Sequence, residues 1–302
     1  MNRKIKDMKK IFKSLAVVLA AVLSVSACSK HEILYDADNV TSKMAEFQLY
    51  NAIPSLSAAE TNFATVVLNS TDTIATANYP LNRYNGIPMG STTRFFVRKP
   101  GDYTIQCFKK AGSTTPDYEG TFTLTACKQV VYLHSWTAAP IVKDALYPYG
   151  QGTRIMSGAK SDSLLFVNFV NLWYSASGVA TTDKLQYQYA FLVNNGKTAT
   201  LNFSVVSDPQ WTNLGNPISF GEQTGFVAVP VPNMGVGYTG GPSTRITSGY
   251  ITVYTRTVDV NTNIVLPTSI DYWTSIGCGR YYNHIVRGVG RQSYMVSTFS
   301  SL

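Results

Sequence analysis

Residues 187–205 read YQYAFLVNNGKTATLNFSV, and this stretch decides the fold class of the chain. On each side of Asn195-Gly196, apolar residues alternate with polar or small ones. The apolar positions are Tyr187, Tyr189, Phe191, Leu201, Phe203 and Val205. Such alternation is typical of a strand with one buried face, and Asn-Gly accepts the positive φ angles of a type I′ turn. The stretch therefore predicts a β-hairpin.

Strand-like segments recur along the chain on both sides of this hairpin. We expect them at 46–51, 63–68, 94–98, 103–109, 122–124, 130–136, from Leu164 onward, and at 226–229, 250–256 and 280–286. For residues 55–64, which overlap the start of the strand expected at 63–68, a short helix is the second interpretation. Charged residues make up only 14% of the chain, which favours half-buried strands joined by polar turns. The predicted class is all-β, with two β-sandwich domains of an immunoglobulin-like or transthyretin-like kind.

A proline- and glycine-containing segment divides these strands into two sets. Residues 137–161 show little periodicity and are predicted to be a linker between a first domain at 45–136 and a second at 162–302. The two sets also resemble each other. Phe47–Asn51 and Val167–Asn171 share the pattern apolar-x-apolar-x-Asn, and Cys127–His134 is similar to Cys278–His284 with an offset of one residue. Their shared order predicts two related domains in which His134 and His284 are equivalent.

The amino terminus has the three parts of a secretory signal. Residues 1–13 hold six basic residues and one acidic residue, and residues 14–27 are an uncharged, mostly apolar run. This run is shorter than the roughly 20 apolar residues that a membrane-spanning helix needs. A basic start, a short apolar stretch and small residues at its end are typical of a signal peptide. We therefore expect residues 1–27 to be removed.

The end of this signal resembles the lipobox of bacterial lipoprotein precursors. Val25-Ser26-Ala27-Cys28 has a branched apolar residue, two small residues and then cysteine. The resemblance implies cleavage before Cys28 and lipid attachment to its sulfur, although an ordinary signal peptide with a chance cysteine is the alternative. Two acyl chains are needed for stable anchoring, and a diacylglycerol supplies them. We expect residues 28–44 to be a tether and the protein to be held at the outer membrane, on its periplasmic or cell-surface side.

Removal of the signal changes the charge of the chain. The full chain has 25 basic and 17 acidic residues, and the mature chain keeps a formal charge of only about +3. Nucleic-acid binding requires a concentrated basic patch. Five arginines lie in the last sixty residues of the chain, but dispersed solvated side chains explain them better. No nucleic-acid partner is predicted; the expected partners are the membrane, through the lipid, and a glycan or protein ligand.

Several segments of the mature chain resemble the domain-of-unknown-function family 4397. In the first half they are the strand ending at Asn51, Phe95-Phe96-Val97 and the stretch Pro100–Ile105. The second half, through Phe220–Glu222, Tyr250–Arg256 and Gly279–Tyr282, resembles a divergent copy. The resemblance covers most of residues 45–302 and implies secreted or lipid-anchored bacterial proteins with repeated sandwich-like domains. Its motifs are structural and carry over no catalytic residue.

Residues with catalytic or metal-binding chemistry are few. The chain has three histidines, and it lacks the common nucleophile, zinc and phosphate-binding motifs. We therefore expect no enzyme, no metal and no cofactor. Of the cysteines that remain after lipidation, Cys107 and Cys127 form a candidate disulfide, since an oxidising compartment permits one. The alternative, which we favour, is that they and Cys278 are small buried residues.

Aromatic side chains are the remaining functional signal. Tyrosine and tryptophan bind sugars and protein surfaces through a broad apolar face with a polar edge. Trp173, Tyr174, Trp211 and Trp273 lie near predicted loops or strand ends and are candidate ligand-binding residues, with a role in the core as the alternative. Trp211 is the best exposed candidate. The predicted function is a non-catalytic cell-envelope lipoprotein that presents two β domains for binding. A fimbrillin-like pilus subunit or assembly component is the second hypothesis, and a hydrolase the last.

Overall fold

The computed structural model describes residues 43–54, 58–87, 95–145, 164–176, 179–191, 211–230, 250–266, 271–277, 281–289 and 294–300. The predicted signal, the lipobox, nearly all of the tether and the Asn195-Gly196 turn lie outside these residues. Val40–Leu302 belongs to one compact unit. We call its strands within residues 45–145 copy 1 and those within residues 164–300 copy 2. No helix among the described residues is both long and apolar enough to span a bilayer.

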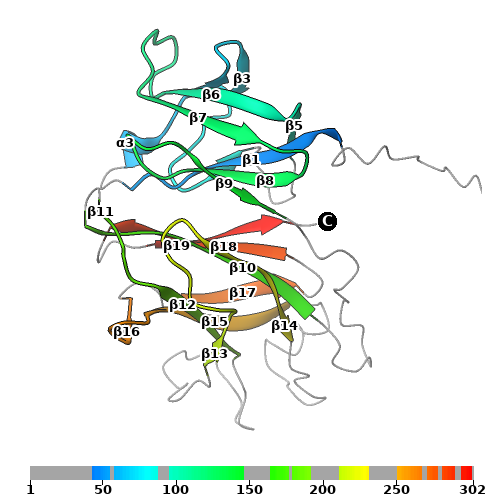
Figure 1. The fold of residues 1–302 in the computed structure, drawn as a ribbon, viewed down its shortest axis with the longest axis vertical. Helices are drawn as coiled ribbons and strands as arrows, with labels where there is room; N and C mark the ends of the chain where they lie inside the picture. Colours follow the sequence, from blue (N-terminus) through cyan, green and yellow to red (C-terminus); the bar gives the residue numbers. More distant parts are fainter. Residues whose placement is uncertain are drawn as a thin grey trace, which may run out of the picture. The chain divides into compact units, whose positions relative to one another are not determined.

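Copy 1 is a sandwich of two sheets (Figure 1). Its inner sheet contains β1 (Ala45–Asn51), β4 (Gly86–Ile87), β5 (Phe96–Arg98), β8 (Lys128–Leu133) and β9 (Ile141–Asp144). Its outer sheet contains β2 (Thr65–Leu68), β3 (Asp72–Ala75), β6 (Gly101–Phe108) and β7 (Tyr118–Leu124). The short helix α3 (Ala58–Thr61) follows β1 and precedes β2, so both interpretations of residues 55–64 are correct in part.

Copy 2 is built in the same way. Its inner sheet contains β10 (Leu164–Ala176), β11 (Val179–Ala180), β14 (Gln223–Pro230), β18 (Tyr281–Val289) and β19 (Tyr294–Ser300). Its outer sheet contains β12 (Leu185–Phe191), β13 (Thr212–Asn213), β15 (Tyr250–Asp259), β16 (Ile264–Val265) and β17 (Asp271–Gly277). The predicted class, all-β with tandem sandwiches, is confirmed.

Strand pairing shows that the two copies are repeats of one topology. In copy 1, β1 lies between β8, to which it is parallel, and the antiparallel strands β4 and β5. In copy 2, β10 lies between the parallel strand β18 and the antiparallel strand β14. The outer sheets match as well, since β3–β2–β6–β7 corresponds to β13–β12–β15–β17.

The asparagines of the sequence repeat are held by the same backbone contacts. Asn51 donates its N–H to the Asn85 carbonyl and accepts the Tyr84 N–H, both at 2.9 Å. Its counterpart Asn171 makes the same two hydrogen bonds to residues 221–222, at 2.7 and 3.1 Å. Asn51, at the end of β1, and Asn171, within β10, are therefore each held to the turn that precedes β4 or β14. We call these contacts the clamp.

The side chains of these asparagines complete the clamp. Both are fully buried, and the Oδ1 atom of each accepts the N–H two residues further on, at 3.2 Å in copy 1 and 3.1 Å in copy 2. The Nδ2 atom of Asn51 donates to the Thr61 carbonyl, and that of Asn171 to the Ile218 carbonyl. Because buried polar groups require partners, this network explains why asparagine stands at both positions.

The two histidines, by contrast, are not equivalent. Leu49 pairs with Val131 in copy 1, whereas Phe169, the counterpart of Leu49, pairs with His284 in copy 2. By strand register His284 therefore corresponds to Val131, and His134 lies beyond the end of β8. The predicted equivalence of the histidines is wrong, because the register places them three residues apart.

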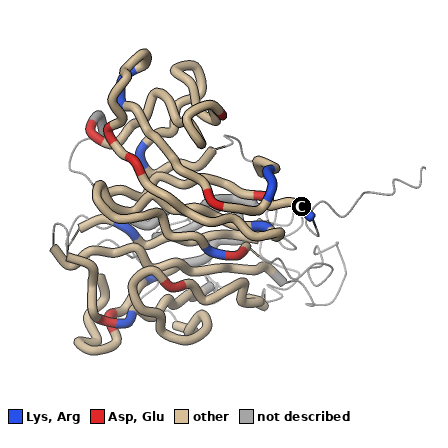
Figure 2. The backbone as a smooth tube through the Cα atoms, turned by 45° about the horizontal axis from the view of Figure 1, so that its top comes forward, with Lys and Arg blue, Asp and Glu red and all other residues tan. Residues whose placement is uncertain are grey.

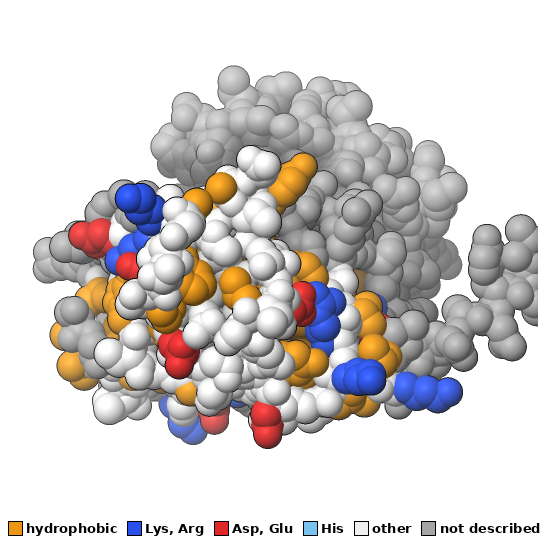
Figure 3. All heavy atoms as spheres, turned by 90° about the horizontal axis from the view of Figure 1, so that it is seen from above, with side chains coloured by type: hydrophobic (Ala, Val, Ile, Leu, Met, Phe, Trp, Pro, Cys, Tyr) orange, Lys and Arg blue, Asp and Glu red, His pale blue; other side chains and the backbone are white. Residues whose placement is uncertain are grey.

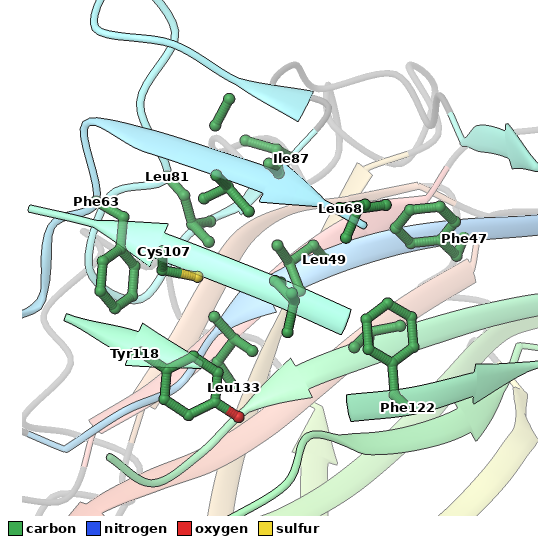
Figure 4. Packing of buried hydrophobic residues seen from close by; sticks show 14 of the residues in the cluster. Phe47, Leu49, Phe63, Leu68, Leu81, Ile87, Cys107, Tyr118, Phe122 and Leu133 are labelled. Atoms are coloured by element: carbon green, nitrogen blue, oxygen red, sulfur yellow. The ribbon is translucent and has the colours of Figure 1, made fainter. Parts of the chain in front are cut away.

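Each sandwich has its own core between its two sheets. In copy 1 the core contains Phe47 and Leu49 of β1, Cys107 of β6 and Phe122 of β7, and Figure 4 shows these side chains directed toward one another. In copy 2, side chains of β10, β12 and β18 form the corresponding cluster. Apolar side chains of this kind stabilise by about 1.5–3 kcal/mol each when fully buried.

A third buried cluster joins the inner sheets of the two copies. Tyr50, Val130 and Tyr132 from copy 1 pack with residues of copy 2 that include Phe166 and Ile285. The inner strands are thus buried on both faces, which is why β10 begins as the nearly continuous apolar run LLFVNFV. The four sheets stack in the order outer, inner, inner, outer (Figure 1).

The boundary between the copies differs from the predicted one. Strand β9 (Ile141–Asp144) lies within the segment 137–161, which the sequence predicts to be a linker, and it pairs with β8 as the edge of the inner sheet. Copy 1 therefore continues at least to Asp144. The periodicity of residues 141–144 is too short to be recognised without the neighbouring strand.

Candidate ligand-binding surface

The aromatic residues selected from the sequence occupy different environments. Tyr174, in β10, is buried, and its hydroxyl shares a hydrogen bond of 2.7 Å with His134 Nδ1. Trp173 is half-buried and packs against the core of copy 2. Tyr174 is thus not available to a ligand, and this prediction is corrected because packing accounts for the residue. The candidate role of Trp173 stays a prediction. The Trp273 side chain and Cys28 lie outside the described part of the chain.

Trp211 is the candidate that lies at the surface. It immediately precedes β13 and is half-buried. The Arg256 guanidinium carbon lies 4.3 Å from the centre of the indole ring. Arg256 belongs to β15, which pairs with β12 in the outer sheet of copy 2. A cation at this distance stacks on the ring, so two segments 45 residues apart in sequence form one surface.

Amide side chains extend this surface across the sheet. Arg256 Nε donates to Gln188 Oε1 at 2.6 Å, and Gln188 Nε2 donates to Asn213 Oδ1 at 2.7 Å. Strand register explains the row, since Gln188 pairs with Arg256 on one side and Asn213 on the other. We call Trp211, Arg256, Gln188 and Asn213 the Trp211 patch. Partial burial lowers the pKa of Arg256, but a guanidinium remains charged in proteins.

The Trp211 patch has the groups that recognise polar, flat ligands. One face of the indole is occupied by the guanidinium, so a ligand contacts the other face or the edge. The amides and the cation next to it can donate and accept hydrogen bonds with hydroxyl groups. A ligand site needs an apolar surface with a few oriented polar groups, and the Trp211 patch supplies both.

The cysteines do not form the candidate disulfide. Cys107 and Cys127 are both free. Cys107 points into the core of copy 1 (Figure 4), and burial raises the pKa of its thiol above the ordinary value. Cys127 precedes β8 and hydrogen-bonds with Thr125 and Asp144 instead. The candidate disulfide is therefore wrong, because Cys107 faces the inside of the sandwich while Cys127 contacts groups at the edge of the inner sheet. The favoured alternative, a small buried residue, is confirmed for Cys107, whereas Cys127 is half-buried.

An open depression of about 530 Å³ lies between β9 and β14. It is lined by Val142, Lys143, Asp144, Glu222 and Gln223. Its two carboxylates already have partners, because Asp144 Oδ1 accepts from a glutamine amide at 3.0 Å and Glu222 Oε2 accepts a backbone N–H at 2.8 Å. The described residues contain no grouping of three or more potential metal ligands. Each of these carboxylates is therefore held by the protein around it.

Sequence reasoning missed an aromatic residue with a strained backbone. Tyr84 has φ of 59°, a left-handed conformation that is unfavourable for a residue with a Cβ. Two guanidinium groups lie close to its ring, with the Arg287 and Arg83 carbons 3.2 and 4.2 Å from the ring centre. Copy 2 has Gly221 at this turn position, also with positive φ. The unusual backbone of Tyr84 is recognised only when its turn is compared with the equivalent turn of copy 2.

Charges are scattered over the described surface. Figure 2 shows basic and acidic positions distributed along the tube of both copies, and the face in Figure 3 has apolar side chains in small groups separated by polar atoms. The largest exposed apolar side chain among the described residues is Tyr79, at 71% exposure. The surfaces in view therefore favour local recognition by a few side chains.

Comparisons with known proteins give few findings. No family model matches the chain, so the resemblance to family 4397 stays a prediction. No curated protein matches it either. Among solved structures, the chain is similar to a proposed cell adhesion protein of Bacteroides uniformis, with 8% identity, 86% of this chain and 98% of the other covered, and a TM-score of 0.25.

Two further solved structures are similar to the same degree. One is a proposed cell adhesion protein of Bacteroides ovatus, with 9% identity, 85% and 96% coverage of the two chains and a TM-score of 0.23. The other is the tip fimbrial protein Mfa3 of Porphyromonas gingivalis with a C-terminal truncation, with 10% identity, 85% and 99% coverage and a TM-score of 0.24. At these scores the similarities carry no argument about function.

Proposed function

We propose that this chain is a non-catalytic lipoprotein of the bacterial cell envelope that binds a glycan or a protein through the outer sheet of copy 2. The observation that carries the proposal is the Trp211 patch, where the Arg256 guanidinium stacks on the indole at 4.3 Å and continues into a row of amides. Aromatic and arginine side chains contribute most of the energy at binding surfaces. A carbohydrate is the ligand class that best fits a flat ring beside amide donors.

The binding proposal is tested by applying the purified mature chain to a glycan array, with the Trp211→Ala variant in parallel. We expect wild type to retain at least one class of glycan and the variant to lose it, because the indole supplies the stacking surface. An array on which wild type and Trp211→Ala give the same pattern would exclude the Trp211 patch as the binding surface.

The proposed attachment to the membrane rests on the segment Val25-Ser26-Ala27-Cys28. Lipidation of Cys28 would leave the β-sandwiches outside the inner membrane, joined to the lipid by the predicted tether. We predict that Cys28→Ala releases the protein from membranes or leaves its signal uncleaved, because the acyl chains have no attachment point. Fractionation and gel mobility measure both outcomes. A Cys28→Ala protein that stays in the envelope and migrates like the wild type contradicts lipid attachment at Cys28.

A pilus subunit is the second candidate function, and the position of β1 favours it. This strand pairs on both sides within the inner sheet, and its Phe47 and Leu49 are fully buried in the core. Its removal would leave a groove that a strand from another chain could fill, as in β-strand addition. Native mass measurement after limited proteolysis tests this candidate. Polymers that form only after cleavage beyond Asn51 support it, and a stable cleaved monomer contradicts it.

A further inference from the structure

Asn85-Gly86 is one of two Asn-Gly sequences in the chain, and it lies in the described part, where β4 begins. The Asn85 side chain is exposed to solvent. The Gly86 N–H donates to the Oδ1 atom of this side chain at 2.9 Å. This contact holds the Gly86 nitrogen against the side-chain amide that precedes it, which is the approach that ring closure between the two groups requires.

We propose that Asn85-Gly86 is a site of spontaneous deamidation in the folded protein. The Gly86 nitrogen loses its proton and forms a bond to Cγ of Asn85, while the bond between Cγ and Nδ2 breaks. The amide leaves as ammonia and carries off that proton. Water then opens the resulting five-membered imide at either of its carbonyls. The products are aspartate, or isoaspartate with the main chain routed through Cγ.

The clamp on Asn51 favours this reaction. The Asn85 carbonyl, which belongs to the same peptide group as the Gly86 nitrogen, accepts the Asn51 N–H at 2.9 Å. A hydrogen bond to the carbonyl draws electron density from the peptide group and stabilises the anion formed when the nitrogen loses its proton. Gly86 has no Cβ to hinder ring closure, and hydroxide reaches the site because Asn85 is exposed.

The two products differ in their effect on the clamp. Copy 2 has Glu222 at the position of Asn85 and keeps the same backbone hydrogen bonds, so the aspartate product is compatible with the turn. Isoaspartate inserts an extra carbon into the main chain between residues 85 and 86. The carbonyl that accepts the Asn51 N–H then moves, and the end of β1 loses part of its support. The site would thus convert slowly into a form with a loosened inner sheet in copy 1.

The experiment follows the folded mature chain at neutral and mildly alkaline pH by peptide mass spectrometry that separates aspartate from isoaspartate. Gly86→Ala is the matched variant. A Cβ at Gly86 would lie 3.4 Å from Tyr50 Cδ2 and 3.5 Å from the Leu49 carbonyl oxygen, which is ordinary contact, and Gly86 does not have positive φ. The variant therefore keeps the fold while hindering the nucleophile.

We expect Asn85 to convert in the wild type, faster at higher pH, and Gly86→Ala to lose most of this conversion. The isoaspartate fraction should melt at a lower temperature than the unmodified protein, while Asn85→Asp should melt like it. Conversion of folded wild type at Asn85 that is no faster than in Gly86→Ala overturns the proposal. Conversion that occurs only after unfolding in urea overturns it too.

Discussion

His284 lies fully buried in the sandwich of copy 2, and Tyr187 is its partner. Their side chains share a hydrogen bond of 2.6 Å between Tyr187 Oη and His284 Nδ1. Burial lowers the pKa of His284 well below its ordinary value of 6.5, and burial also lowers the pKa of His134. Both imidazoles are therefore neutral in the folded protein at neutral pH.

The stability of the protein should consequently decrease in acid. In the unfolded chain the imidazoles take up protons near pH 6.5, whereas the folded chain resists protonation until lower pH, so the unfolded state binds more protons between these limits. The contribution of the two neutral histidines to the free energy of unfolding is fully present above about pH 6.5. Below this pH it is lost, by at most about 1.4 kcal/mol per pH unit for each histidine. Urea unfolding across this range measures it.

His284→Gln serves as the control for this pH dependence. Glutamine can keep a hydrogen bond to Tyr187 but does not titrate, so the variant should show a flatter dependence of unfolding free energy on pH. A variant as sensitive to acid as the wild type would show that another group is responsible.

Trp211 shows what sequence reveals about single residues. The sequence predicts it to be the best exposed of the four candidate aromatic residues, and the structure places it half-buried at the surface. Its partner Arg256 could not be identified from sequence, because strand register alone brings them together. The same reason explains the error with Tyr174 and the failure of the candidate disulfide, because the surroundings of Tyr174 and Cys107 depend on which face of a strand each side chain occupies.

At the scale of elements, the clamp between each inner strand and its turn should be a main source of stability. Asn51→Ala removes the acceptor of the Ile53 N–H and the donor to the Thr61 carbonyl inside the protein. Leaving such buried groups without partners costs about 1–3 kcal/mol each. We expect Asn51→Ala and Asn171→Ala to lower the free energy of unfolding by similar amounts, about 2–3 kcal/mol, in urea titrations.

Gln106→Ala is the matched control for the clamp variants. Its amide donates to Glu119 at 2.7 Å on the solvent side of the outer sheet, where water can replace the lost bond. It should therefore change stability by about 0.5 kcal/mol or less. If the asparagine variants are as mild as this control, the clamps do not support the inner strands.

Strand positions could be predicted well where the pattern was strong. The apolar run from Leu164 indicated where β10 begins, and the repeated apolar-x-apolar-x-Asn pattern identified two equivalent strands. The short strands β4, β9 and β11 carry no periodicity of their own, because each forms through pairing with a longer neighbour. The turn and the second strand of the predicted hairpin at Asn195-Gly196 lie outside the described residues. Its first strand is described as β12, which pairs with β13 at Gln188 and Tyr189 and with β15 on its other side.

At the scale of the whole molecule, the third cluster couples the two copies. Inner-sheet residues such as Tyr132 and Phe166 are buried between the sandwiches and not within either one. We predict that the mature chain unfolds in a single cooperative transition, because neither copy can unfold without exposing the apolar inner face of the other. Circular dichroism and calorimetry measure it, and two well-separated transitions would contradict the coupling.

The third cluster also bears on whether copy 2 folds by itself, because part of that cluster belongs to copy 2. The predicted second domain at 162–302 implies that a fragment starting near Ser161 folds alone, and the core of copy 2 supports this. However, the fragment would expose Phe166, Val170 and Ile285, which contact copy 1 in the full chain. Packing between sheets is invisible in the sequence, because an inner face and a core face are equally apolar.

The most direct test of the proposed function compares two tryptophans. Each ring lies under a cation, Arg256 over Trp211 and Lys109 over Trp136, but Trp136 packs against the core of copy 1. The measurement is the binding of the best array glycan to Trp211→Ala and Trp136→Ala, together with their melting temperatures. We predict that Trp211→Ala weakens binding by roughly 2 kcal/mol with little change in melting temperature, while Trp136→Ala melts lower and still binds. Unchanged glycan binding by Trp211→Ala, at a melting temperature near that of wild type, would contradict the proposal.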